Sequence, residues 1–271
     1  LDGPAATPVG MRGSPSERSD AQVSVLGHRG RGMLAGGTVG LRLGAGGRIA
    51  GDQAVQNDGS IGSINNSGTL FGSDRGIYQT STGQIGTIVN DGVIAAGTTG
   101  PNAAGGIANG GLILSIVNNG TILSSHSSGI GNNLTSSSIG TLVNNGLISG
   151  VTSGIYSQGT FTQITNTGQI TGPKAGIWNQ GGVITNLNNS GTISGGTKAI
   201  NLLGGSIGAL TNSGLISGPV AFSIGLGASL TSIISGSMVF ITFPWIALEL
   251  TGLASSAGLL TAITNIPGLL L

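Results

Sequence analysis

The sequence has no cysteine, few aromatic residues and little charge of either sign. Without cysteine, the 271-residue chain cannot form a disulfide scaffold, a cysteine-ligated zinc site or a cysteine nucleophile. Charged residues make up only 6% of the chain, whereas an ordinary soluble domain carries roughly a quarter. The nine basic residues are balanced by eight acidic ones and form no basic stripe, so we expect no binding to nucleic acid.

Groups that perform acid–base or metal chemistry are also scarce. No Asp or Glu lies between residues 92 and 248, and glycoside hydrolysis requires two carboxyl groups across the scissile bond. The two histidines, His28 and His126, have no Asp or Cys nearby at the spacing of a metal site or a catalytic triad. The sequence therefore predicts no enzyme activity, no metal site and no cofactor.

Glycine, in contrast, is abundant, and it recurs within a repeated phrase. Collagen is excluded, because the 54 glycines do not occupy every third position. Seven phrases such as VNNGLI (143–148) and TNSGLI (211–216) recur at intervals of 22 to 28 residues. Weaker copies precede and follow them, which gives eight or nine units between residues 37 and 237. The first asparagine of the Asn-x-Gly phrase is Asn66, Asn90, Asn118, Asn144, Asn166, Asn189 and Asn212.

Each unit contains three short apolar stretches separated by Gly, Asn and Ser. One aliphatic residue lies two places before the repeated Asn, another lies four places after it, and a small residue followed by Ile comes later, as in Gly154-Ile155. Short runs rich in β-branched residues and bounded by turn formers are typical of strands. The repeat therefore predicts an all-β fold, a single-stranded parallel β-helix of about eight or nine coils with three short strands per coil. Its inward Ile and Leu are buried only when coils stack on each other.

The repeated Asn and Gly have a mechanical interpretation in such a stack. We expect the seven asparagines to form a hydrogen-bonded ladder along one corner of the coils. We expect the glycine that follows to supply a positive φ at that corner. A charge repeated in every coil would repel itself along the whole stack, which explains why charged residues are few. The longer units predict extra loop residues, for example at 98–105 and 124–128.

The two ends of the chain do not follow the repeat. Residues 1–36 are rich in Gly, Ser, Pro and Arg and are predicted to form a disordered lead-in or an irregular cap. Residues 238–271 are strongly apolar. They fit a cap on the open end of the stack, a membrane segment, or a tail that is native only in a longer chain. The sequence thus predicts a repeat domain at 37–237 between two dissimilar ends.

Outward-facing aromatic residues are the one candidate for a binding surface. The residue after the third inward aliphatic points outward because strand side chains alternate, and on adjacent coils it is Tyr156 and Trp178. Two stacked aromatic rings can grip a sugar ring or a partner protein, or they can simply stabilise each other. Lys174 and Lys198 lie near them. The acids of the first coils are interpreted as solvated loop charges, with Asp74 placed to pair with Arg75.

The repeated phrase IGTLVNNGLISG (139–150), with its copies at 184–195 and 207–218, resembles the coils of autotransporter passenger domains of the type V secretion family. The resemblance covers residues 37–237. It implies a right-handed β-helix, export by a Gram-negative bacterium, and display at the cell surface and outer membrane or release as a secreted virulence factor. It also implies a signal peptide and a translocator β-barrel. Neither is recognisable in this sequence, so we expect the chain to be a piece of a longer passenger.

The expected function follows from the repeat, the scarcity of carboxylates and this resemblance. The chain is predicted to be a non-catalytic, adhesin-type rod whose partner is a protein or glycan of the host cell or its matrix. One alternative is a self-assembling structural fibre, because exposed strand edges template growth. A second, less favoured alternative is a β-helix enzyme that acts on polysaccharide, which requires an acid cluster that most of the chain lacks.

Overall fold

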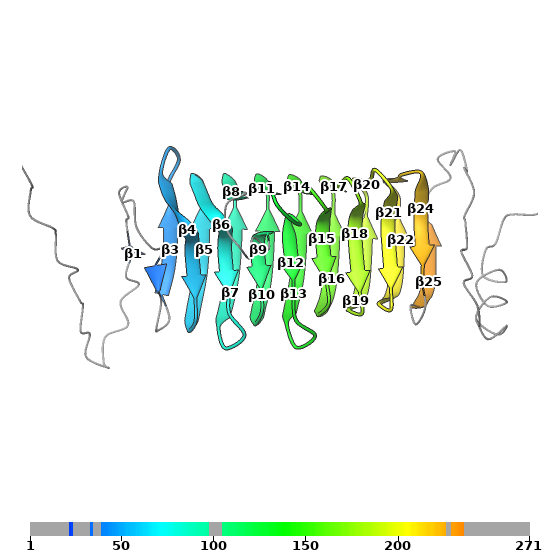
Figure 1. Cartoon of the computed structure of the whole chain (residues 1–271), viewed down its shortest axis with the longest axis horizontal. Coiled ribbons are helices and arrows are strands. Elements are labelled where there is room, and N and C mark those ends of the chain that lie inside the picture. The colour runs from blue at the N-terminus through cyan, green and yellow to red at the C-terminus, as the bar shows by residue number, and fades with distance from the viewer. Residues whose placement is uncertain (1–21, 24–32, 35–38, 98–104, 226–228, 236–271) are drawn as a thin grey trace, which may run out of the picture.

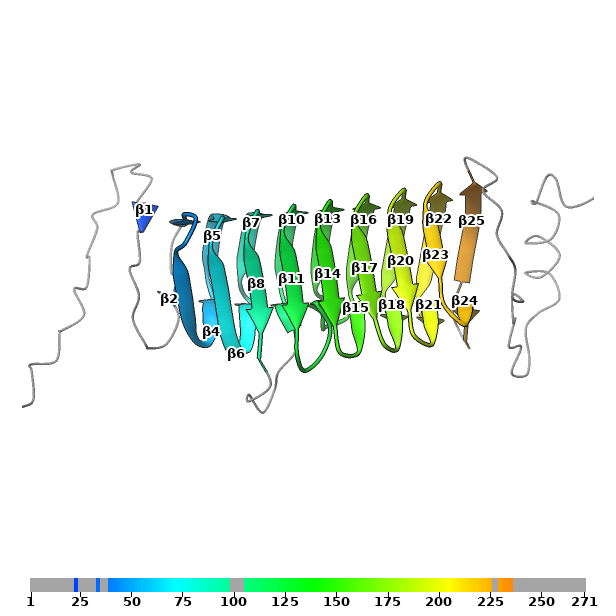
Figure 2. The same cartoon turned by 90° about the horizontal axis from the view of Figure 1, so that it is seen from above.

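The computed structural model describes residues 22–23, 33–34, 39–97, 105–225 and 229–235. Within these ranges the regular structure is entirely β, without a helix, and forms a parallel β-solenoid of about eight turns. Figures 1 and 2 show the coils stacked along the long axis of a rod, with the chain advancing from β3 to β25. The predicted all-β fold of stacked parallel strands is confirmed.

One face of the rod is a 10-stranded parallel sheet that takes one strand from each coil. Its strands in spatial order are β1 (Gln22–Val23), β3 (Val39–Leu43), β5 (Ser60–Asn66), β7 (Gln84–Asn90), β10 (Leu112–Asn118), β13 (Ser138–Asn144), β16 (Thr160–Asn166), β19 (Val183–Asn189), β22 (Ser206–Asn212) and β25 (Ser229–Ser235). From β5 to β22 the register places equivalent repeat positions side by side, so that Asn118 pairs with Asn90 on one side and Asn144 on the other.

A 15-stranded sheet forms the remaining faces, and it divides into two arms at β6 (Thr69–Gln79), which pairs with both β8 and β9. The first arm contains β8 (Val93–Ala96), β11 (Thr121–Ser124), β14 (Leu147–Gly150), β17 (Gln169–Gly172), β20 (Thr192–Gly195) and β23 (Leu215–Ser217). The second arm contains β9 (Gly105–Asn109), β12 (Ile130–Asn132), β15 (Ser153–Ser157), β18 (Ala175–Gln180), β21 (Lys198–Leu203) and β24 (Val220–Ile224).

The early coils differ from the later ones at the junction of the two arms. Here the second and third strands merge into the long strands β4 (Arg48–Asn57) and β6, with a register shift between Gly51 and Gln53. β4 also pairs with the short strand β2 (Met33–Leu34). The later coils have three separate strands each, as predicted. The loop of residues 125–129 between β11 and β12 lies close to the insertion predicted at 124–128.

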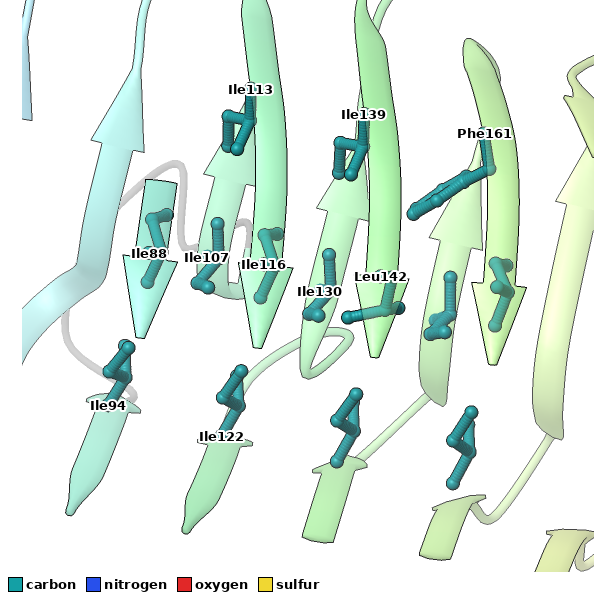
Figure 3. Packing of buried hydrophobic residues seen from close by; sticks show 14 of the residues in the cluster. Ile88, Ile94, Ile107, Ile113, Ile116, Ile122, Ile130, Ile139, Leu142 and Phe161 are labelled. Carbon is teal, nitrogen blue, oxygen red and sulfur yellow. The ribbon is translucent and has the colours of Figure 1, made fainter. Parts of the chain in front are cut away.

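The interior of the rod is filled almost entirely by aliphatic side chains in four columns. Figure 3 shows Ile88, Ile116 and Leu142 in one column, with Ile94 and Ile122 in a second and Ile107 and Ile130 in a third. These columns coincide with the three aliphatic positions of the repeat, and the side chains named are 0% exposed. A fourth column, five places before each repeated Asn, was not identified from the sequence. It contains Ile61, Ile85, Ile113, Ile139, Phe161, Ile184 and Ile207.

The glycine of the Asn-x-Gly phrase is required for a reason different from the predicted one. Positive φ angles occur, among the described glycines, at Gly46, Gly105, Gly181 and Gly204, and none of these belongs to the phrase. A Cβ placed on Gly146 would instead overlap the backbone carbonyl oxygen of Gly120, the equivalent glycine one coil earlier. The same overlap recurs at Gly92, Gly120, Gly168, Gly191 and Gly214. The prediction of a left-handed corner was wrong, because close stacking of the coils demands glycine here.

The predicted dissimilar ends lie mostly outside the described residues. Two short strands of segment 1–36, β1 and β2, pair in parallel with β3 and β4. Segment 238–271 is not among the described residues, so its interpretation as a cap, membrane segment or tail stays a prediction. In the part of the chain that is described, no helix has the length and apolar character needed to cross a membrane.

Candidate functional site

The seven repeated asparagines lie one above the next at the corner between the 10-stranded sheet and the first arm. Each of the first six donates a hydrogen bond from Nδ2 to Oδ1 of the Asn in the following coil, over 2.7 to 2.8 Å, and the row ends on Asn212. The first six side chains are at most 2% exposed. We call this row the inner ladder.

Backbone carbonyls satisfy the second amide proton of the inner ladder. Asn144 Nδ2, for example, donates to Asn166 Oδ1 at 2.7 Å, to the carbonyl oxygen of Gln169 at 3.0 Å and to that of Gly146 at 3.2 Å. Buried amides need such partners because an unpaired buried polar group costs about 1–3 kcal/mol. The inner ladder is thus a structural element, which joins each coil to the next.

A second ladder runs outside the first, formed by the residues that directly follow the inner asparagines. Asn119 Nδ2 donates to Asp91 Oδ1 at 2.8 Å, Asn145 Nδ2 donates to Asn119 Oδ1 at 2.8 Å, and Thr167 Oγ1 donates to Asn145 Oδ1 at 2.7 Å. These four side chains are exposed. We call this row the outer ladder; it was not predicted from the sequence.

A third polar column lies at the corner where each coil passes into the next. It comprises, in register, Asn57, Gln79, Asn109, Asn132, Ser157 and Asn179, and every one of these side chains is 0% exposed. Asn57 Nδ2 donates to Gln79 Oε1 at 2.7 Å, and Asn109 Nδ2 donates to Asn132 Oδ1 at 2.9 Å. The sequence does contain a pattern from which this column could have been predicted, because a polar residue lies two places after the third inward Ile, as at Asn109 and Asn179.

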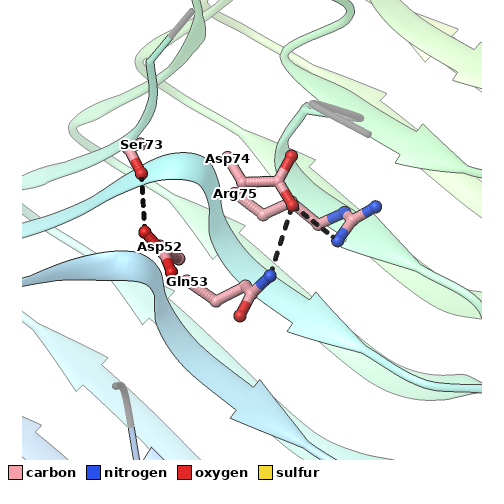
Figure 4. Close-up of polar contacts among 5 residues, drawn as sticks. All are labelled: Asp52, Gln53, Ser73, Asp74 and Arg75. Carbon is pink, nitrogen blue, oxygen red and sulfur yellow. Dashed lines mark hydrogen bonds and ion pairs between the residues drawn. The ribbon is translucent and has the colours of Figure 1, made fainter. Parts of the chain in front are cut away.

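The described carboxylates all lie in the first coils, where each accepts a hydrogen bond from another side chain. Figure 4 shows Asp74 between Gln53 and Arg75, at the junction of the long strands β4 and β6. Asp74 Oδ2 is 2.9 Å from Arg75 Nη1 and accepts from Gln53 Nε2 at 3.2 Å. Asp52 accepts from Ser73, and Asp58 accepts from Gln56. The predicted contact between Asp74 and Arg75 is present, but Asp74 is only 6% exposed and is therefore not a solvated loop charge.

Tyr156 and Trp178 are paired in register on β15 and β18, so they stand on adjacent coils. Their ring centroids are 5.9 Å apart and the rings meet edge to face at 87°, an arrangement that contributes about 0.5–1.5 kcal/mol beyond area burial. Both are half-buried. Tyr156 Oη donates to Gln180 Oε1 at 3.3 Å, and burial raises the pKa of the phenol above its usual value of 10.0.

Two lysines flank this aromatic pair. Lys174 Nζ lies 5.8 Å from the centroid of the Trp178 ring. Lys198, one coil further, donates from Nζ to Ser223 Oγ at 3.0 Å and to Asn201 Oδ1 at 3.5 Å, and Asn201 is the register partner of Trp178. Between residues 92 and 248 these are the only residues with a formal charge. We call Tyr156, Trp178, Asn201, Lys174 and Lys198 the aromatic–lysine strip.

Neither metal chemistry nor similarity to known proteins adds a second candidate. The described residues contain no group of three or more His, Cys, Asp or Glu that could hold a metal ion. His126 lies exposed in the serine-rich loop between β11 and β12. Comparison of the chain with protein families, with curated proteins and with solved structures finds no match. The fold places the protein in the class of parallel β-solenoids.

Proposed function

We propose that the chain is a non-catalytic adhesive rod, a piece of an autotransporter-like passenger displayed on the surface of, or secreted by, a Gram-negative bacterium. The parallel solenoid is compatible with that architecture, and the repeated phrase resembles the coils of such passengers. Its partner is a protein or glycan of a host cell or matrix.

The main support for the proposal is that the buried polar side chains and the carboxylates form hydrogen bonds within the rod. The buried amides form ladders that join coil to coil, and each described carboxylate accepts a hydrogen bond from a neighbouring side chain. A catalytic acid pair needs two carboxyl groups that face a common substrate. Partly exposed Ser and Thr side chains lie in register along the 10-stranded sheet, as at Thr87, Ser115 and Thr141, and form an extended polar surface suited to contact with a partner.

A binding and product assay on the whole chain tests this proposal. The chain is applied to immobilised matrix proteins and glycans, and the same polysaccharides are checked for new reducing ends or unsaturated products. We expect saturable binding to at least one ligand without product. Product release would contradict a non-catalytic role, and the absence of binding to every ligand would contradict adhesion.

A further inference from the structure

The aromatic–lysine strip combines three kinds of chemistry on one outward face. Trp178 and Tyr156 supply aromatic surface, Asn201 supplies an amide, and Lys174 and Lys198 supply two ammonium groups. The register fixes their relation, since the backbone nitrogen of Lys198 donates to the carbonyl oxygen of Lys174 at 3.0 Å. The two cations therefore stand on consecutive coils, Lys174 on the coil of Trp178 and Lys198 on the next.

The charge on this strip is not balanced locally. Neither lysine forms an ion pair with a described residue, and the sequence has no carboxylate from residue 92 to residue 248. The lysines occupy one stretch of the rod, whereas the four described acids lie at residues 52–91. A ligand on this strip thus meets two positive charges without a competing negative one, which favours an anion.

The aromatic pair selects among anions. Sugar rings present an apolar face of C–H groups that packs on aromatic rings, and their hydroxyls bond to partly exposed amides such as those of Asn201 and Gln180.

We propose that the aromatic–lysine strip binds an acidic polysaccharide, with a sugar ring against Trp178 and Tyr156 and the anionic groups on Lys174 and Lys198. This inference rests on the proposed adhesive function and names the partner class of one surface. The ligand is defined by shared chemistry, a sugar bearing carboxylate or sulfate groups. On binding, Lys174 exchanges its contact with the Trp178 ring for the ligand's anionic group.

The test uses the whole chain and four immobilised probes. Polygalacturonate carries carboxylates only, heparin carries both carboxylates and sulfates, dextran is neutral, and polyglutamate is acidic without sugar. We expect the two acidic polysaccharides to bind, with affinity falling as salt rises, and dextran and polyglutamate to bind at least tenfold more weakly. Binding of heparin alone would assign the anion as sulfate. Polyglutamate binding equal to polygalacturonate would overturn the assignment to a glycan.

Two variants locate the site. The double variant Lys174→Gln, Lys198→Gln removes the two ion pairs with ligand, and we expect about a tenfold loss of affinity. Trp178→Ala removes the stacking surface and is expected to weaken binding to polysaccharide in both high and low salt. Arg48→Gln is the matched control, because Arg48 also lies over an outward ring, that of Phe71, at 5.2 Å but on the β4–β6 strands.

The outcomes separate this inference from the proposed function. Equal binding by the wild type and the double-lysine variant, or an equal loss in Arg48→Gln, would overturn the strip as the site. The adhesive function would still stand if matrix proteins or neutral glycans bound. Circular dichroism of each variant, compared with the wild type, ensures that lost binding reports the surface and not the fold.

Discussion

Two ladders of hydrogen-bonded side chains run side by side on the solenoid in opposite environments. Asn144 belongs to the inner ladder and is 0% exposed, whereas Asn145, the next residue, belongs to the outer ladder and faces solvent. The two residues have the same chemistry and are adjacent in the chain. They differ in the number of partners, since Asn144 Nδ2 has three acceptors and Asn145 Nδ2 has one.

The ladders also run in opposite directions. The inner asparagines donate toward the following coil, whereas Asn145 and Asn119 donate toward the preceding coil and end on Asp91. A carboxylate only accepts hydrogen bonds, so Asp91 fits at the accepting end of the outer row. The stack therefore accommodates a charged side chain where solvent and a hydrogen-bond donor surround it, as at Asp91, and has no charged side chain in the buried inner ladder.

The largest effect is expected for replacing an inner amide by a carboxylate. In Asn144→Asp an oxygen takes the place of Nδ2 and faces three oxygen acceptors without solvent. An unpaired buried charge costs about 3–5 kcal/mol, so we expect the free energy of unfolding to fall by about 4 kcal/mol in urea denaturation at neutral pH. Asn145→Asp is the matched control and should cost less than about 1 kcal/mol. Equal losses would break the comparison.

The third residue of the phrase should be nearly as sensitive. Gly146→Ala places a methyl group onto the carbonyl oxygen of Gly120, and the backbone must move to relieve the overlap. We expect a loss of about 3 kcal/mol. Gly44→Ala is the control, since a Cβ there meets nothing within 4 Å. If both variants unfold at the same urea concentration, close stacking is not what demands glycine at the corner.

Replacing the amides by alanine should also destabilise the inner ladder more than the outer one, with smaller losses of stability. Asn144→Ala removes the donor to Asn166 and the acceptor for Asn118, and leaves buried polar groups unpaired. We expect the free energy of unfolding to fall by about 2 kcal/mol. Asn145→Ala exposes its former partners to water and should change stability by about 0.5 kcal/mol or less. Thermal and urea unfolding measure both. A larger loss for the outer residue would reverse our assignment of the two ladders.

Tyr156 is half-buried, so its exposure lies between that of the inner and that of the outer ladder. The change in stability caused by ionising its phenol should be the smallest of these effects. Burial raises the pKa of its phenol, so the folded state favours the neutral form. The associated stability is present below the unfolded pKa near 10 and is lost as pH rises through the higher folded value. Titration of tyrosinate absorbance in the Tyr78→Phe variant reports Tyr156 alone, as the chain has two tyrosines. Ionisation at or below the ordinary value would contradict this.

Much of the fold could be predicted because a solenoid repeats its environment. Each Ile before or after the repeated Asn meets the same neighbours one coil away, so a sequence period becomes a column in space, as with Ile88, Ile116 and Leu142. The outward pairing of Tyr156 with Trp178 follows from the same period.

Other features could not be predicted from the sequence because they depend on residues outside a single repeat phrase. The third polar column varies among Asn, Gln and Ser, and loops of different length change its distance from the inner asparagines. The merged strands β4 and β6 depend on a register shift near Gly51. At the corner positions, a positive φ angle and close packing against the neighbouring coil would each require glycine, so the sequence alone does not separate them. Only the position of the carbonyl one coil away distinguishes the two causes.

A continuous buried row of asparagine amides joins the coils of this rod. Hydrogen exchange of the assigned side-chain amides, followed by nuclear magnetic resonance, tests it most directly. We expect the Nδ2 protons of Asn90, Asn118, Asn144 and Asn166 to exchange orders of magnitude more slowly than those of Asn119 and Asn145. Exchange of the inner amides at the same rate as the outer ones would contradict it.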